Sequence, residues 1–171
     1  MDFREELLSQ NLEIPYSSDV KCLRSSLRIN GKTIPNRIGI APLEGFDSTL
    51  DGSPTDSVYR RYLRFSEGGA GLIWFEACAV SNDSKSNPYQ MKLHDGNVDA
   101  FRKLIAAMDE KSREPAYKVL QLTHSGRVSK DDSWNPIPVS PKRYEGDLAR
   151  YASDEYIANT IKDHIHAAKL A

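Results

Sequence analysis

Hydrophobic residues along the chain form two kinds of pattern. Continuous apolar runs, short and rich in β-branched or aromatic residues, favour buried strands, and they lie at residues 37–41, 70–80 and 117–122. Apolar residues at helical spacing favour amphipathic helices, and they lie at residues 57–67, 98–108 and 157–168. The resulting order of strand, helix, strand, helix, strand and helix predicts an α/β fold with right-handed crossovers and a parallel sheet.

Residues with marked end preferences flank these segments. Thr55 or Asp56 is expected to cap the first core helix, and Asp95 or Asn97 the second. The run at 70–80 is apolar almost throughout, which predicts a strand buried on both faces. These signals place each core helix directly between two core strands.

The N-terminal part carries its own local signals. Asp2 and Glu5 match the capping box of a short helix. Asn30 and Gly31 predict a tight hairpin, because both central residues of such a turn need positive φ. We expect one domain over residues 1–171, in which residues 1–35 form a helix and hairpin cap and residues 36–171 form the first βα units.

The segment between the third strand and the last helix shows no regular period. A loop of that length inside a compact domain is usually functional, or else it argues against the assignment of the elements around it. The segment contains Trp134, Pro136, Pro138 and Pro141.

Charge and cysteine content exclude several classes of protein. The chain has 23 Lys and Arg against 24 Asp and Glu, so no global field favours nucleic acid or an anionic membrane. The N-terminus lacks the pattern of a signal peptide, and no stretch approaches the ~20 apolar residues of a membrane span, so we expect a cytoplasmic protein. Cys22 and Cys78 are too few for a disulfide framework and lack metal-ligand spacing.

Five segments carry a family resemblance. They are NRIGIAPLEG, DGSPTDSVYRRY, GGAGLIWFEACAV, LHDGNVDAFRKLI and LQLTHSGR. In this order and spacing they resemble the old yellow enzymes, which are FMN-dependent NAD(P)H:flavin oxidoreductases, over almost the whole chain from Asn36 onward. The resemblance implies the N-terminal portion of a (β/α)8 TIM barrel, incomplete, with about three to four βα units after the hairpin; such barrels have eight strands.

The resemblance also implies which residues contact FMN. Active sites of such barrels lie at the carboxyl ends of the strands. In this family the backbone after the first strand passes beneath the flavin ring, which implies contacts from Ala41, Pro42, Leu43 and Glu44. Ala77 would lie beside the ring. Gln121 would bond the pyrimidine edge, since an amide offers both a donor and an acceptor.

The chain departs from the family pattern at two positions. Glu44 stands where many members place Thr or Cys, and Phe46 stands where one branch places a substrate-facing Tyr, which implies a substrate-binding role. A carboxylate beside a ring that becomes anionic on reduction disfavours the reduced form, unless the carboxyl is protonated or turned away. His124 and Arg127 match an HxGR motif, for which we expect structural hydrogen bonds and loop anchoring.

The implied function is part of an oxidoreductase that uses FMN and NAD(P)H to reduce small activated alkenes, an ene-reductase or enoate or dienoyl reductase. The family's substrate-polarising His pair and phosphate-binding loops match no residue of this chain, so catalytic residues are not assigned. We therefore expect that the chain alone neither retains FMN through purification nor reduces activated alkenes with NADPH.

Two alternatives stay open. A non-catalytic fragment or half-barrel would need a partner chain, or self-association, to cover its open sheet edges. APLEG followed by Phe46 and Asp47 is also similar to the tRNA-dihydrouridine synthases. DGSPTD, QLTHSGR and the lack of a basic excess favour the old yellow enzymes over that family.

Overall fold

A three-stranded parallel sheet forms the centre of the computed structural model, which describes residues 3–12, 15, 17, 19–129 and 152–171. Its strands are β3 (Gly39–Ile40), β4 (Leu72–Ala79) and β5 (Tyr117–Thr123), in the order β3-β4-β5. Gly39 pairs with Leu72, which in turn pairs with Tyr117. The parallel pairing confirms the predicted α/β class.

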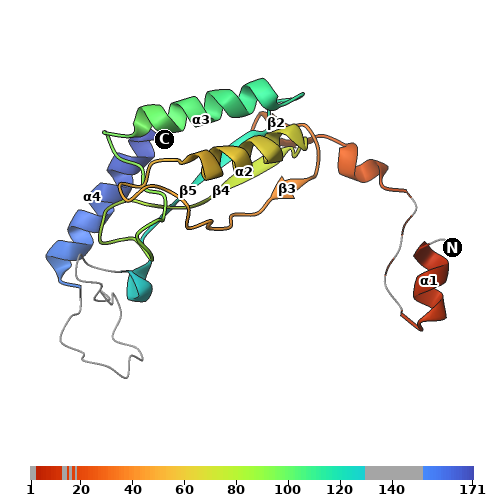
Figure 1. The fold of residues 1–171 in the computed structure, drawn as a ribbon, viewed down its shortest axis with the longest axis horizontal. Coiled ribbons are helices and arrows are strands. Elements are labelled where there is room, and N and C mark those ends of the chain that lie inside the picture. The colour runs from red at the N-terminus through yellow and green to blue at the C-terminus, as the bar shows by residue number, and fades with distance from the viewer. Residues whose placement is uncertain (1–2, 13–14, 16, 18, 130–151) are drawn as a thin grey trace.

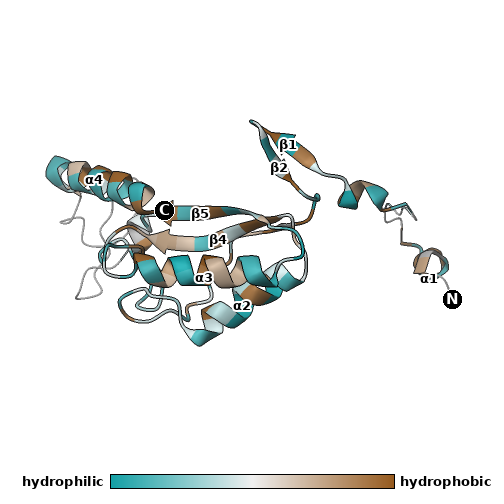
Figure 2. Ribbon diagram, turned by 90° about the horizontal axis from the view of Figure 1, so that it is seen from above, coloured by the Kyte–Doolittle hydropathy of each residue, from teal (hydrophilic) through white to brown (hydrophobic). Residues whose placement is uncertain are grey.

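Helices connect these strands. α2 (Asp56–Glu67) lies between β3 and β4, α3 (Val98–Lys111) lies between β4 and β5, and α4 (Asp154–Leu170) follows β5. Figures 1 and 2 show α2 and α3 side by side along one face of the sheet, with α4 at the end where β4 and β5 terminate. Among the described helices, none is both long and apolar enough to cross a membrane.

The core lies between this sheet face and the two helices. Tyr62 of α2 stacks on Phe75 of β4, with ring centroids 4.3 Å apart. The Tyr62 hydroxyl accepts a hydrogen bond from the Glu76 amide at 2.9 Å. Other buried members of the cluster are Val58, Ile73, Cys78, Met91, Leu104 and Met108. Full burial of such a side chain contributes about 1.5–3 kcal/mol.

The caps of the core helices are partly as expected. Thr55 caps α2, and its side chain accepts from the Val58 amide. Asn97 occupies the N-cap position of α3 but makes no cap hydrogen bond. Its side chain instead accepts from the His94 amide at 3.0 Å and donates to the Lys92 carbonyl at 2.8 Å. Asn97 therefore orders the turn before the helix.

The N-terminal residues form separate small elements. They are α1 (Phe3–Ser9), the 3-10 helix η1 (Lys21–Arg24), β1 (Leu27–Ile29) and β2 (Lys32–Ile34). β1 and β2 form an antiparallel hairpin. Its turn residues Asn30 and Gly31 have φ of 47° and 79°, the left-handed conformation that the sequence predicts. The expected capping residue Asp2 lies outside the described residues.

Two predicted strands differ in detail from the structure. β3 is shorter than residues 37–41. At its start, the amide of Ile38 donates to the Asn36 side chain at 3.0 Å instead of to a neighbouring strand. The expectation that β4 is buried on both faces is wrong in its first half, where Trp74 is 41% exposed on a face that α2 and α3 do not cover. The loop residues Trp134, Pro136, Pro138 and Pro141 lie outside the described residues.

A bulge divides β4 into two parts. Trp74 pairs with Val119, and Ala77 pairs with Gln121. Between these two pairs, β4 therefore contains one residue more than β5. The extra residue shifts the alternation of side chains between the two faces. Glu76 lies within this irregular step.

Candidate functional site

The residues predicted for the cofactor gather at the carboxyl edge of the sheet. Ala77 and Gln121 are direct register partners on β4 and β5. Residues 41–47, the β3 loop, follow β3 and reach β4, where the Gly45 amide donates to Glu76 Oε2 at 2.8 Å. The structure thus brings together two strand ends and the loop that contains Ala41, Pro42, Leu43 and Glu44.

The β3 loop presents apolar side chains to solvent. Leu43 is 80% exposed and Phe46 is 57% exposed. Phe46 also has a φ of 51°, a conformation that is uncommon for a bulky residue. Uncovered apolar side chains and backbone strain together are typical of ligand-binding loops.

Gln121 has an unsatisfied amide. Its Oε1 is shielded from solvent and has no hydrogen-bond partner among the described residues. An acceptor left in this state costs about 1–3 kcal/mol relative to a paired one. The pyrimidine edge of a flavin carries a ring N–H between two carbonyls, so Gln121 and this edge are chemically complementary. The residues present therefore fit the ring of FMN.

Glu44 is half-buried and points toward the loop after β4. Its carboxylate accepts from the Ser86 hydroxyl at 3.2 Å. Burial raises the pKa of the Glu44 carboxyl above 4.5, and the Ser86 hydrogen bond opposes this shift. Gln90 connects Ser86 to the sheet, because it accepts from the Ser86 amide at 2.7 Å and donates to the Ala77 carbonyl at 3.0 Å.

Sequence reasoning missed a buried ion pair beside the β3 loop. Glu76 on β4 is 2% exposed, and Arg61 of α2 donates to its carboxylate at 2.9 and 3.2 Å. Arg61 also donates to Asp47 Oδ1 at 2.8 Å. A signal was available, because a carboxylate inside the apolar run LIWFEACA requires a charged or hydrogen-bonding partner.

Two opposing effects act on the pKa of the Glu76 carboxyl. Burial is the larger effect and raises the pKa of the Glu76 carboxyl above 4.5. The Gly45 amide and the Arg61 guanidinium lower the same pKa. The hydrogen bonds from Gly45 and Arg61 thus offset part of the free energy lost when the Glu76 carboxylate is removed from water.

His124 joins the end of β5 to α4. Its Nδ1 accepts from the Gly126 amide at 2.9 Å, and its Nε2 lies 2.7 Å from the Tyr156 hydroxyl. Because Nδ1 accepts, the proton of the neutral ring is on Nε2, which donates to Tyr156. Burial lowers the pKa of His124 below 6.5. These contacts give His124 the expected anchoring role, and Arg127 lies in the adjacent 3-10 helix η2 (Gly126–Val128).

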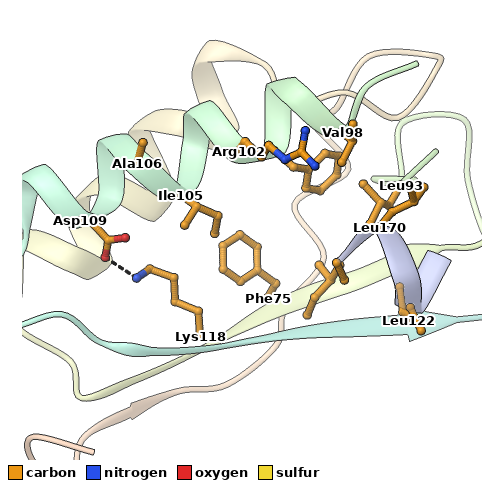
Figure 3. Close-up of a pocket in the computed structure, with 14 residues that line it drawn as sticks. Phe75, Leu93, Val98, Arg102, Ile105, Ala106, Asp109, Lys118, Leu122 and Leu170 are labelled. Carbon is orange, nitrogen blue, oxygen red and sulfur yellow. Dashed lines mark hydrogen bonds and ion pairs between the residues drawn. The ribbon is translucent and has the colours of Figure 1, made fainter. Parts of the chain in front are cut away.

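A separate apolar cavity of about 680 Å³ lies between α3, β5 and the end of α4. Figure 3 shows Phe75 and Ile105 projecting into the space between α3 and the sheet. Leu122 and Leu170 line its other side. None of the residues predicted to bind cofactor or substrate lines this cavity, so the candidate site is not located there.

Known proteins are similar to this chain in sequence and in the arrangement of its elements. The model of the NADH:flavin oxidoreductase / NADH oxidase family matches residues 25–171. A probable NADH-dependent flavin oxidoreductase of Bacillus subtilis is 29% identical over 150 residues, which are 83% of this chain and 38% of the relative. The old yellow enzyme homologue from Zymomonas mobilis is 28% identical with a TM-score of 0.71, over 87% of this chain and 44% of that chain.

A further solved structure supports the fold alone. The Old Yellow Enzyme from Pichia sp. is 21% identical with a TM-score of 0.74, over 87% of this chain and 42% of that chain. The chain spans less than half the length of each of these relatives.

These comparisons confirm the predicted fold, resemblance and cofactors. The solved relatives are TIM barrels, so the described elements are the N-terminal portion of a (β/α)8 barrel. FMN and NAD(P)H are the cofactors of the family, as the sequence predicts. The roles of the individual site residues stay predictions. With the family model matched over most of its length, this chain belongs to the NADH:flavin oxidoreductase / NADH oxidase family.

Proposed function

We propose that this chain supplies the flavin-binding part of an FMN-dependent NAD(P)H oxidoreductase that reduces small activated alkenes. The observation that carries the proposal is the unpaired, shielded Oε1 of Gln121, adjacent in register to Ala77. An amide acceptor that has no partner among the described residues, at the carboxyl edge of a parallel sheet, is suited to a ligand N–H.

Each candidate residue has a distinct role in this proposal. When bound, FMN supplies hydride transfer between NAD(P)H and the alkene. The backbone of residues 41–44 packs beneath the ring, and Ala77 leaves space beside it because its side chain is small. Gln121 Oε1 accepts from the pyrimidine edge. Phe46 presents its exposed ring to the substrate.

Glu44 limits how strongly the site favours a reduced, anionic ring. Its carboxylate bonds Ser86, and its raised pKa increases the fraction of the neutral acid. The raised pKa reduces the negative charge that Glu44 brings to the ring, whereas the Ser86 hydrogen bond stabilises the charged carboxylate and opposes this effect. The departure from Thr or Cys at this position is therefore compatible with flavin binding.

A second reading, a half-barrel that associates with another chain, is favoured by the exposed face of α4. Ile157, Ile161 and Ile165 are 41%, 56% and 52% exposed and share one face of the helix. β5 is the last strand of the described sheet and has a free edge. Both features suit self-association. The two readings are compatible, since a partner could complete the barrel.

The experiment that tests the proposed function joins this chain to the C-terminal part of a relative's barrel. The C-terminal portion of the Zymomonas mobilis homologue, beyond the aligned 44%, is fused after residue 171. We expect the folded fusion to retain FMN and to convert 2-cyclohexenone to cyclohexanone with NAD(P)H. Gln121→Leu should weaken FMN binding about tenfold, as expected for one lost hydrogen bond in a buried site.

The exposed Gln10→Leu serves as the matched control and should leave FMN affinity unchanged. A folded fusion that retains FMN but forms only hydrogen peroxide would contradict the alkene reductase. Equal FMN affinity in Gln121→Leu and Gln10→Leu would contradict the assigned ring contact.

A further inference from the structure

Glu76 directs its carboxylate at the β3 loop. Its Oε2 accepts a hydrogen bond from the Gly45 amide at 2.8 Å. The side chain is 3% exposed, so this carboxylate exchanges few of its hydrogen bonds with water. A charged acceptor makes roughly twice the contribution of a neutral one to such a bond. The backbone of Gly45 is thus fixed to β4 by a charged contact.

Arg61 contacts the same loop on both sides of Gly45. Its Nη1 donates to the Leu43 carbonyl at 3.3 Å, and its Nη2 donates to Asp47 Oδ1 at 2.8 Å. The same guanidinium donates to both oxygens of Glu76. One planar cation therefore ties the start and the end of this stretch to a strand and a helix.

Gly45 is required by this packing. A Cβ built on Gly45 would lie 2.2 Å from Arg61 Nη1, a distance that real atoms do not show. The guanidinium therefore lies directly against the backbone of the loop. Any side chain at position 45 must displace either the loop or Arg61.

The bulge of β4 connects this ion pair to the predicted ring contacts. Glu76 lies in the irregular step and meets Arg61 of α2, whereas the next residue, Ala77, pairs with Gln121. Without the extra residue, the register set by Trp74 and Val119 would pair Gln121 with Glu76 rather than with Ala77.

We propose that Arg61 and Glu76 are positioning residues, which fix the backbone of residues 43–47 in the conformation that packs beneath the flavin ring. The flavin part of this inference rests on the proposed function, while the contacts on the loop do not. Neither side chain needs to touch the ring. They act by reducing the number of loop conformations, so that binding the ring does not have to order the loop.

The test measures the loop without any ligand. In the 171-residue chain, amide hydrogen exchange and the proton shift of Gly45 are followed by NMR in wild type, Glu76→Gln and Arg61→Lys. The exposed pair Arg102–Asp99, at 2.9 Å, supplies matched controls as Asp99→Asn and Arg102→Lys. We expect exchange at Gly45 to rise about tenfold in both test variants, the factor of one lost charged hydrogen bond, and to stay unchanged in both controls.

A pH titration distinguishes positioning from general stability. In wild type the Gly45 amide shift should titrate with Glu76 as well as with the adjacent Glu44, and the contribution of Glu76 should be absent in Glu76→Gln. Gly45→Ala keeps both charges but separates them from the backbone, so residue 45 should again exchange faster while amides of α3 do not. If Glu76→Gln does not fold, Gly45→Ala and Arg61→Lys still test whether the ion pair fixes the backbone of the loop.

FMN affinity of the same samples supplies the second measurement. We expect the test variants to bind FMN at least about fivefold more weakly than the controls, because the loop must be ordered on binding. Unchanged exchange at Gly45 in the folded variants would overturn the proposal, as would faster exchange with unchanged FMN affinity. If wild type binds no FMN, the proposed function of this chain fails, whereas Gly45 exchange still decides whether the ion pair fixes the loop.

Discussion

At the scale of single residues, Gln121 and Glu44 differ in how much of their surroundings the sequence could predict. Gln121 lies near the end of an apolar strand within a family motif, so its position could be predicted from the sequence. The structure adds that its Oε1 has no hydrogen-bond partner among the described residues. The environment of Glu44 could not be predicted, because Ser86 lies in a loop far along the chain and comes close only after β4 has formed. The Arg61–Glu76 pair was missed for the same reason, since its partners come from three separate segments.

Glu44 should make the stability of the chain depend on pH. Its pKa is raised above 4.5 in the folded state, so the folded chain retains this proton at pH values where the unfolded chain has released it. The free energy of unfolding must then fall as pH rises from 4.5 through the folded pKa. Glu44→Gln removes this contribution, so the variant should become more stable relative to wild type as pH rises.

Urea unfolding of wild type and Glu44→Gln across this pH range measures the difference directly. Glu67→Gln, on the exposed side of α2, is the control for removing a carboxylate. Because Glu76 is present in all three proteins, its own titration cancels in the comparison. Parallel curves for wild type and Glu44→Gln would show that Glu44 is not the group responsible.

At the scale of elements, local signals were sufficient for the helices and insufficient for the sheet. α2 begins after Thr55 as the cap pattern predicts, because a cap depends on residues three apart. The bulge in β4 has no such local cause. It depends on Ala77 pairing with Gln121 and on Glu76 reaching Arg61, and both contacts form only after the crossovers bring the segments together.

One hydrogen bond that helps to attach α4 next to the end of β5 can be removed by mutation. Tyr156→Phe deletes the hydroxyl that His124 Nε2 contacts at 2.7 Å. We expect about 0.5–1.5 kcal/mol less protection of α4 amides, with β4 unaffected. Tyr89→Phe, at an exposed position, is the control. Hydrogen exchange of α4 measures the effect, and equal protection in the two variants would contradict this attachment.

At the scale of the whole molecule, the exposed apolar surfaces matter most. The isoleucine stripe of α4 is exposed, and β5 is the last strand of the described sheet. The amphipathic spacing predicted the helix correctly, but no described element covers its apolar face. Helical periodicity indicates that a face is buried in some assembly, and does not indicate which chain buries it.

Self-association of the chain should depend on this stripe. Ile161→Lys places a charge in its centre and should shift the sedimentation coefficient toward the monomer, because burying an unpaired charge is unfavourable. Ala158→Lys, an exposed position of the same helix outside the stripe, supplies the comparison. A chain that stays monomeric at all concentrations, or that associates equally well in both variants, would contradict the half-barrel reading.

The measurement that tests the central claim most directly is a map of FMN contacts on the chain. Backbone and side-chain amide shifts are recorded for the 171-residue chain as FMN is added, which detects binding too weak to survive purification. The account predicts that the shifts concentrate on residues 41–46, Ala77 and the Gln121 side chain. Shifts concentrated instead around the cavity lined by Leu93, Ile105 and Leu170, or no shifts at any FMN concentration, would contradict it.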